Sequence, residues 1–220
     1  MFIAAVTLLH VLVFVYWLGA DLGSFYSSTI LIDSRQSTPA RMAAARVLEN
    51  VDMAPRTALI LAFPTGASLA AAKGWLTPAV SQPLLPLAWA GALIWLWIAW
   101  RIHHKHLPSG HGLRRLDLAI RWVVLISLVV GAGLGTLGVI NLALFIRLKL
   151  TILAAAIGAG LAIRRLIAPL GPAFMTMAAS GATPQTDAVI TGALSKVRPV
   201  VLGLWVLILV AAFVGLATPT

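Results

Sequence analysis

The chain has 220 residues, of which 60 % are hydrophobic and 10 % are charged, with a formal net charge of +10 and no cysteine. Soluble domains carry about 25 % charged residues, so this composition excludes an ordinary soluble protein and indicates a chain that lies in lipid. The missing cysteines exclude disulfides and thiolate metal sites. The basic residues form no stripe with interleaved aromatics, so we expect no nucleic-acid partner.

Six apolar stretches are long enough to cross a hydrocarbon core about 30 Å thick, which takes about 20 helical residues. In chain order they are residues 2–32, 51–72, 84–102, 116–140, 142–163 and 197–216. The residues before Leu9 include no Lys or Arg, so we interpret the first stretch as a retained helix rather than a signal peptide. Pro64 predicts a kink in the second stretch. We expect an all-α membrane helix bundle in which residues 1–220 form a single transmembrane domain.

The loops between these stretches differ in charge. Residues 33–50, 103–115 and 164–196 contain most of the basic side chains, whereas the alternate loops contain only Lys73. Basic loops tend to stay on the cytoplasmic side of a membrane, next to anionic headgroups. The sequence therefore predicts six crossings with both termini outside the cytoplasm (N-out/C-out), in the cytoplasmic (inner) membrane of a bacterium.

Two of these basic loops contain segments with a predicted local structure, and the third contains several histidines. Residues 38–50 are rich in Ala and Arg and predict a short helix, whereas residues 169–191 predict a linker with one interfacial turn. The loop 103–115 contains His103, His104, His106 and His111. This run looks like a metal patch, but a metal site needs fixed geometry and supporting partners. We therefore expect solvated loop histidines.

Small residues recur in two of the predicted helices. Gly19 and Gly23 form one G-x-x-x-G pair, and Gly131 and Gly135 form another. Such pairs let helix backbones approach closely in lipid. They indicate either packing within the bundle or space for a flat cofactor or a second copy of the chain.

Polar residues within an apolar helix are costly, so each one suggests a function. His10, Phe14, Trp17 and Asp21 follow one another at spacings of four, three and four residues, which places them on one helix face. This face is expected to look into the bundle. His10 lies about two turns from the outer end of its helix, at a depth comparable to that of Arg147 and Lys149. We expect these three residues to line one outward-side site, unless His10 only bonds a neighbouring helix and the two cations only reach outward to headgroups.

A second polar group is expected near the cytoplasmic face. Asp52 and Arg56 are four residues apart in one stretch, and Asp117 and Arg121 are four apart in another. Each pair can neutralise itself within its own helix. Asp21 reaches the same side, so these residues form either structural pairs or a proton relay.

Several of these positions resemble a known group of proteins. Leu9-His10 followed by Trp17-x-Gly19 resembles the first helix of the CopD-like superfamily of bacterial membrane proteins, which includes CopD copper-resistance proteins and HemJ-type haem-binding protoporphyrinogen oxidases. Asp52 to Pro55, with Pro64-x-Gly66 and Leu69, is similar to the second helix of an uncharacterised family in that group. Two later features add to the likeness: Arg147-Leu148-Lys149-Leu150, which resembles the HemJ-type Lys-Leu element, and the set Arg198, Trp205 and Gly215.

The resemblance implies roles for two residues. His10 corresponds to the haem-ligating or metal-ligating histidine of the first helix, and Lys149 corresponds to the functional lysine of the HemJ type. No other predicted membrane segment contains a histidine, so haem held by two histidines is not expected.

These features leave three hypotheses. The first is a haem-b-binding oxidoreductase or electron-transfer protein that meets a redox partner or quinone. In it, His10 is the axial ligand with Phe14 and Trp17 beside it, and Arg147 and Lys149 pair with propionates or substrate. The second is a permease for copper or a small solute, with Asp21, Asp52 and Asp117 as gate or proton relay; few methionines argue against copper(I). The third is a non-catalytic anchor for a partner subunit, with homo-oligomerisation left open.

Overall fold

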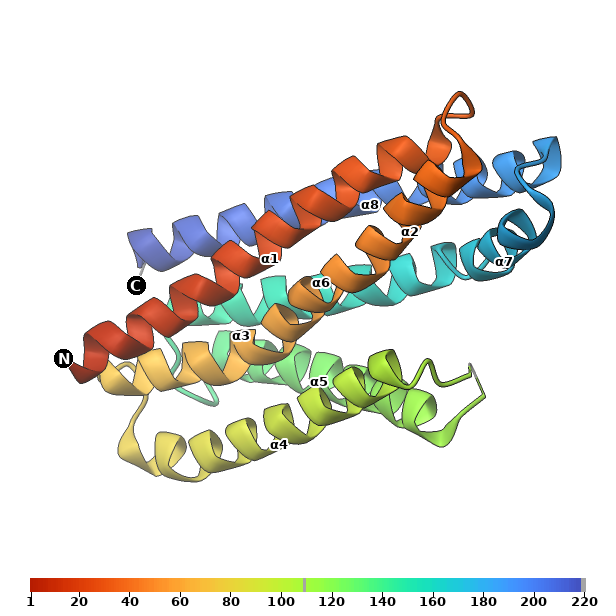
Figure 1. Ribbon diagram of the computed structural model, residues 1–220. Helices are drawn as coiled ribbons and strands as arrows, with labels where there is room; N and C mark the ends of the chain where they lie inside the picture. Colours follow the sequence, from red (N-terminus) through yellow and green to blue (C-terminus); the bar gives the residue numbers. More distant parts are fainter. Residues whose placement is uncertain (109, 219–220) are drawn as a thin grey trace.

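The computed structural model describes all residues except 109, 219 and 220. Over these residues the chain forms eight α-helices and no β-strand (Figure 1), which confirms the expected all-α class. The helices are α1 (Phe2–Ile32), α2 (Thr38–Val51), α3 (Met53–Ala72), α4 (Pro78–His104), α5 (Gly112–Thr136), α6 (Leu144–Leu166), α7 (Leu170–Ser180) and α8 (Pro184–Ala217).

Five helical segments in the described part of the chain are long and apolar enough to cross a membrane, so the chain is a multi-pass membrane protein. These are α1, α4, α5, the segment Leu144–Ser180 that joins α6 and α7, and α8. The expected second span, α3, is not among them. It contains Arg56, Pro64 and Thr65, and many of its residues are buried by other helices instead of facing outward. A helix that is enclosed by protein does not need a continuous apolar surface.

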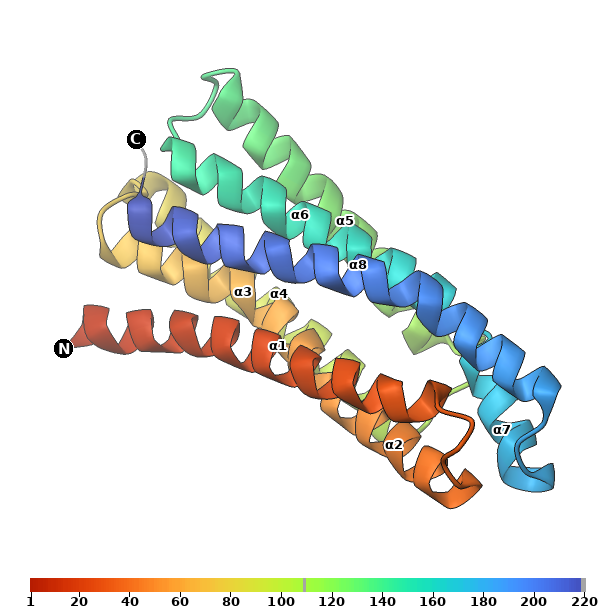
Figure 2. The same cartoon turned by 90° about the horizontal axis from the view of Figure 1, so that it is seen from above.

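Six helices pack in a closed ring. In order around the ring, α1 contacts α3, α3 contacts α4, α4 contacts α5, α5 contacts α6, α6 contacts α8, and α8 returns to α1. Each of the six contributes to one core, for example through Trp17, Ile60, Trp95, Leu128, Ile157 and Leu204. Both termini lie at the same end of the bundle (Figure 2).

At the opposite end, a second core joins the end of α1 to α2, α7 and the start of α8. Its centre includes Leu31, Met177 and Ile190, which are fully buried. Arg41 is also buried; its Nη1 lies 2.7 Å from Asp187 Oδ1. Its Nε donates to the carbonyl oxygen of Leu31 at 3.0 Å, which satisfies a carbonyl that the end of α1 would otherwise leave without a partner.

The helix boundaries correct several expectations from the sequence. Residues 169–191 were expected to form a linker, but they form α7 and the first turns of α8, which begins at Pro184 rather than near residue 197. Thr183 and Thr186 form a capping box that starts α8, and polar residues on its outer face lower the hydropathy of a helix whose inner face is buried. The short helix expected over residues 38–50 is present as α2.

The remaining boundaries move by a few residues. α4 begins at Pro78 instead of residue 84, and α5 ends at Thr136 instead of residue 140. His103 and His104 therefore belong to the last turn of α4 and not to a loop. Asp52 alone separates α2 from α3.

Candidate functional site

The first candidate site lies around His10, in the half of the bundle that contains the termini. The His10 Nδ1 atom lies 2.9 Å from Thr65 Oγ1 of α3. Thr65 is completely buried, and its hydroxyl donates to the carbonyl oxygen of Leu61 at 2.6 Å. A threonine hydroxyl has a single proton, so Thr65 accepts the hydrogen bond from His10. His10 is therefore protonated at Nδ1, and its Nε2 carries a free lone pair.

A glycine makes this contact possible. A Cβ atom at Gly66 would lie 3.1 Å from Cε1 of the His10 ring and 3.7 Å from both ring nitrogens. The ring thus rests directly on the α3 backbone, where any other residue would push it away. The structure in this way brings together two sequence motifs, Leu9-His10 and Pro64-x-Gly66.

The two cations of α6 diverge. The Lys149 amino group lies against the α8 backbone at Gly215, where a Cβ would collide with Nζ. Gly215 lies near the end of α8, at the same end of the bundle as the start of α1, so Lys149 and His10 share this half of the bundle. Arg147 turns to α5 instead, with its Cγ 3.1 Å from the position of a Cβ at Gly135. Residues two apart on a helix face different ways, so the expected three-residue site reduces to His10 and Lys149.

Arg147 is nevertheless notable because its Nε atom is buried, although the residue as a whole is only half-buried. Its Nε atom has no hydrogen-bond partner among the residues that the structure describes. The other predicted small-residue contacts are loose: a Cβ at Gly19 would meet nothing within 4 Å, and one at Gly131 would make an ordinary 3.8 Å contact with Leu150. Of these glycines, only Gly135 is required by close packing.

Phe14 and Trp17 continue the α1 stripe inward from His10. Trp17 is buried, and Phe14 packs against the same core of the six-helix ring. The two aromatic side chains separate His10 from Asp21, which is 11 residues away, or about 16 Å along the helix. The predicted stripe therefore leads from one polar site, through an apolar layer, to a second.

The second site centres on Asp117, which is almost completely buried. Asp117 accepts hydrogen bonds from Trp95 Nε1 at 2.9 Å, Arg121 Nε at 3.1 Å and Arg164 Nη1 at 2.6 Å. The expected Asp117–Arg121 pair is present, but it is part of a larger cluster. Arg164 and Trp95 come from other helices, so no spacing within α5 could have revealed them.

A cavity of about 90 Å³ lies beside this cluster. The charged residues that line it are Asp21, Asp52, Arg56, Arg121 and Arg164. Its apolar lining includes Trp17, Leu59 and Leu204. The Asp52–Arg56 pair, with atoms 2.5 Å apart, stands at an exposed edge, whereas Trp17 and Leu204 are buried. The volume is sufficient for several water molecules.

Asp21 differs from the other carboxylates of the cavity. Its Oδ2 atom is buried and forms no hydrogen bond within the described residues. Ser24 Oγ and Trp205 Nε1 are also buried and have no hydrogen-bond partner in the described part of the chain. The Trp205 indole lies next to Asp21 but does not reach hydrogen-bond geometry. In the sequence, only the CopD-like resemblance drew attention to Trp205, because no residue pattern within its own helix indicates a polar neighbour.

Three of the four clustered histidines are neighbours at the end of α4: the His103 ring centroid lies 5.5 Å from that of His104 and 6.3 Å from that of His106. His106 Nδ1 lies 3.6 Å from Glu49 Oε1, and both side chains are exposed. His111 accepts from the Leu113 backbone amide at 3.1 Å and caps α5. Across the described part of the chain, no three His, Asp or Glu side chains are grouped as a metal ion requires.

Comparison with known proteins gives no assignment, since no family model, curated protein or solved structure matches this chain. The likeness to the CopD-like superfamily therefore remains a prediction. Any functional conclusion rests on the geometry around His10 and on the charged cavity.

Proposed function

We propose that this multi-pass membrane protein binds haem b through His10 and takes part in membrane oxidoreduction or electron transfer. The observation that supports this proposal is the 2.9 Å contact between His10 Nδ1 and Thr65 Oγ1. Because the Thr65 hydroxyl already donates to Leu61, Nδ1–H is the donor and Nε2 is left as a free base. Histidines that ligate metals usually donate their other ring N–H to a protein acceptor in this way.

The surrounding residues suit such a group. Gly66 leaves the space that the His10 ring occupies, and Lys149 lies against Gly215 of α8. The Lys149 amino group offers a charged donor for a carboxylate such as a propionate. Haem supplies one-electron chemistry when bound, and the chain supplies one imidazole ligand and one cationic partner. The CopD-like resemblance of this region is consistent with the same assignment.

We also propose the membrane arrangement on which this function depends. α3 is the sixth crossing, both termini lie outside the cytoplasm, and the membrane is the bacterial inner membrane. The charge bias of the loops supports this orientation, and the common end of the two termini agrees with an even number of crossings. His10 then lies in the outer half of the bilayer, and the charged cavity lies in the inner half.

The test is an absorption spectrum of protein purified in mild detergent from haem-supplemented cells. We expect a Soret band, with α and β bands after reduction by dithionite, which His10→Ala abolishes. His104→Ala is the matched control, because it removes an exposed histidine from α4, and it should leave the bands unchanged. Thr65→Val keeps His10 but removes its acceptor, so the bands should shift or weaken. Folded wild-type protein without a Soret band contradicts the proposal.

A second candidate function follows from the charged cavity. A cavity with an unpartnered Asp21 and an exposed Asp52–Arg56 edge suits a permease for a small polar solute or proton. Proteoliposomes that contain the wild-type chain would then show solute or proton flux, and Asp21→Asn would reduce it. Flux that is equal in the two proteins contradicts this candidate.

A further inference from the structure

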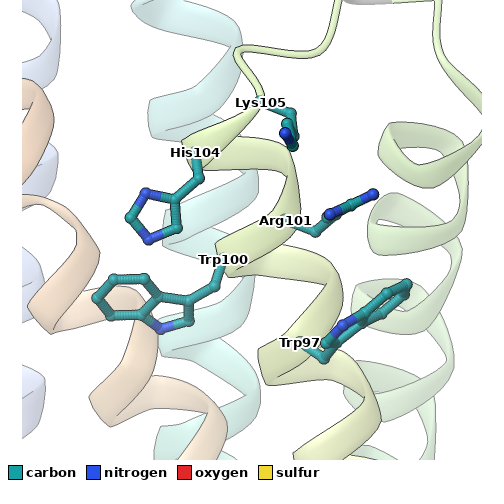
Figure 3. Close-up of a pocket in the computed structure, with 5 residues that line it drawn as sticks. All are labelled: Trp97, Trp100, Arg101, His104 and Lys105. Carbon is teal, nitrogen blue, oxygen red and sulfur yellow. The ribbon is translucent and has the colours of Figure 1, made fainter.

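A shallow hollow of about 220 Å³ lies on the outer surface of α4. It is near the C-terminal end of this helix, next to the basic loop that follows it. Four residues of α4 and its C-cap residue line it: Trp97, Trp100, Arg101, His104 and Lys105. They form two ridges, as Figure 3 shows. Trp97, Arg101 and Lys105 follow one another at intervals of four along one side, and Trp100 and His104 form the other side. Ridges of this kind leave a groove along the helix between them.

One wall of the groove is held in place. The Trp100 Nε1 atom donates to Thr57 Oγ1 of α3 at 3.2 Å. The His104 ring lies 5.2 Å from the Trp100 ring at an interplanar angle of 34°, which extends the same wall. Because the indole is fixed before any ligand arrives, little side-chain freedom is lost on binding.

The opposite wall is open and cationic. The Trp97 side chain is 60 % exposed, an orientation typical of indoles at a membrane–water interface. Arg101 and Lys105 are exposed beyond it, and the five lining residues include no acid. The groove thus changes from indole surface to cationic surface along α4. Its occupant must therefore combine a hydrocarbon part with an anionic head.

We propose that this groove binds one anionic glycerophospholipid. Its phosphate lies against Arg101 and Lys105, and the upper part of an acyl chain lies between Trp97 and Trp100. Arginine donors match phosphate oxygens in a planar fork, and lysine adds a point charge. A free phosphate would use the cations but leave both indole walls without a partner.

The first experiment is native mass spectrometry of the detergent-solubilised chain with added phosphatidylglycerol or phosphatidylcholine. We expect one phosphatidylglycerol to bind several-fold more tightly than phosphatidylcholine. The double variant Arg101→Gln/Lys105→Gln should weaken phosphatidylglycerol binding by about tenfold or more, since each basic residue near a lipid surface contributes about a fivefold effect. Arg115→Gln/Lys196→Gln is the matched control; it removes two exposed cations that do not line the groove and should retain wild-type affinity.

A second measurement reports on the indole walls. In vesicles, brominated phosphatidylglycerol should quench tryptophan fluorescence more than brominated phosphatidylcholine does, and Trp97→Phe/Trp100→Phe should remove this difference. Trp122→Phe removes another outward-facing indole, which is 50 % exposed on α5, and should preserve it. Equal losses in the groove and control variants overturn the proposal. Displacement of the lipid by an equal concentration of glycerol 3-phosphate also overturns it, because the site would then recognise phosphate alone.

Discussion

The carboxylates on the two sides of the charged cavity differ in their hydrogen bonding. On the side formed by α4, α5 and α6, Asp117 accepts from three side chains, two of which are arginines. On the side formed by α1 and α8, Asp21 has a buried oxygen without a partner in the described chain. A fully satisfied buried network stabilises one arrangement of helices, whereas an unsatisfied group is available to a ligand, water or proton. The Asp117 cluster therefore fixes the packing of α4, α5 and α6, whereas Asp21 on α1 keeps a hydrogen-bonding oxygen that no described side chain uses.

The largest expected effect on stability comes from removing Asp117, whose hydrogen bonds are all satisfied. Asp117→Ala leaves Arg121 and Arg164 without a counter-charge inside the bundle, which should destabilise the protein by about 3–5 kcal/mol. Asp21→Asn removes no hydrogen bond and should change stability by less than about 1 kcal/mol. Denaturation with sodium dodecyl sulfate, followed by circular dichroism, compares the two variants. Equal effects would erase the distinction between the two sides.

The second effect extends the comparison to the core formed by α2, α7 and the ends of α1 and α8. Arg41→Ala removes both the ion pair with Asp187 and the donor to Leu31, for an expected loss of about 2–4 kcal/mol. Arg46→Ala, on the exposed face of α2, should cost little. Hydrogen exchange should show α2 and α7 opening before the six-helix ring. Uniform protection of all helices would contradict this order.

The third effect tests the α1 side through its glycine contact. Gly66→Ala places a methyl group 3.1 Å from the His10 ring, which cannot retreat without lengthening its bond to Thr65. We expect this substitution to lower the free energy of unfolding by about 1 kcal/mol. At an open helix position, in contrast, Gly→Ala raises it by up to about 1 kcal/mol. Gly19→Ala is such an open position and serves as the control. Thermal unfolding in detergent measures both, and a gain at both positions would show that the contact is loose.

The smallest effect concerns an exposed carboxylate outside the spans. Hydrogen bonds from the Arg35 side chain and backbone lower the pKa of Asp33 from 3.8 to about 2. A lowered pKa stabilises the folded chain above pH 3.8, and this contribution disappears as the pH falls through about 2. Asp33→Asn should therefore be slightly less stable than wild type at pH 7 and equal to it at the lowest pH. If the two proteins still differ in stability at the lowest pH, the difference does not come from the charge of Asp33.

Much of the fold could be predicted from the sequence because apolar length and helical spacing are local properties. The apolar stretches, the short helix at residues 38–50 and the pairs Asp52–Arg56 and Asp117–Arg121 all follow from spacing along one helix. The sequence located only the apolar stretch 197–216 of α8, because the polar outer face of the earlier turns hides a buried inner face formed with α2 and α7. Hydropathy averages over both faces and cannot detect that packing.

The sequence by itself determined that the chain lies in lipid, that it is helical, and that His10, Trp17 and Asp21 share one face of α1. Only the tertiary structure decided what those residues meet. It placed His10 on Gly66 and Thr65, joined Arg164 to Asp117, and separated Arg147 from Lys149. The physical reason is that each of these contacts joins different helices. The side chain that completes a hydrogen bond in a bundle is set by which helices are neighbours, and no periodicity within one helix encodes that choice.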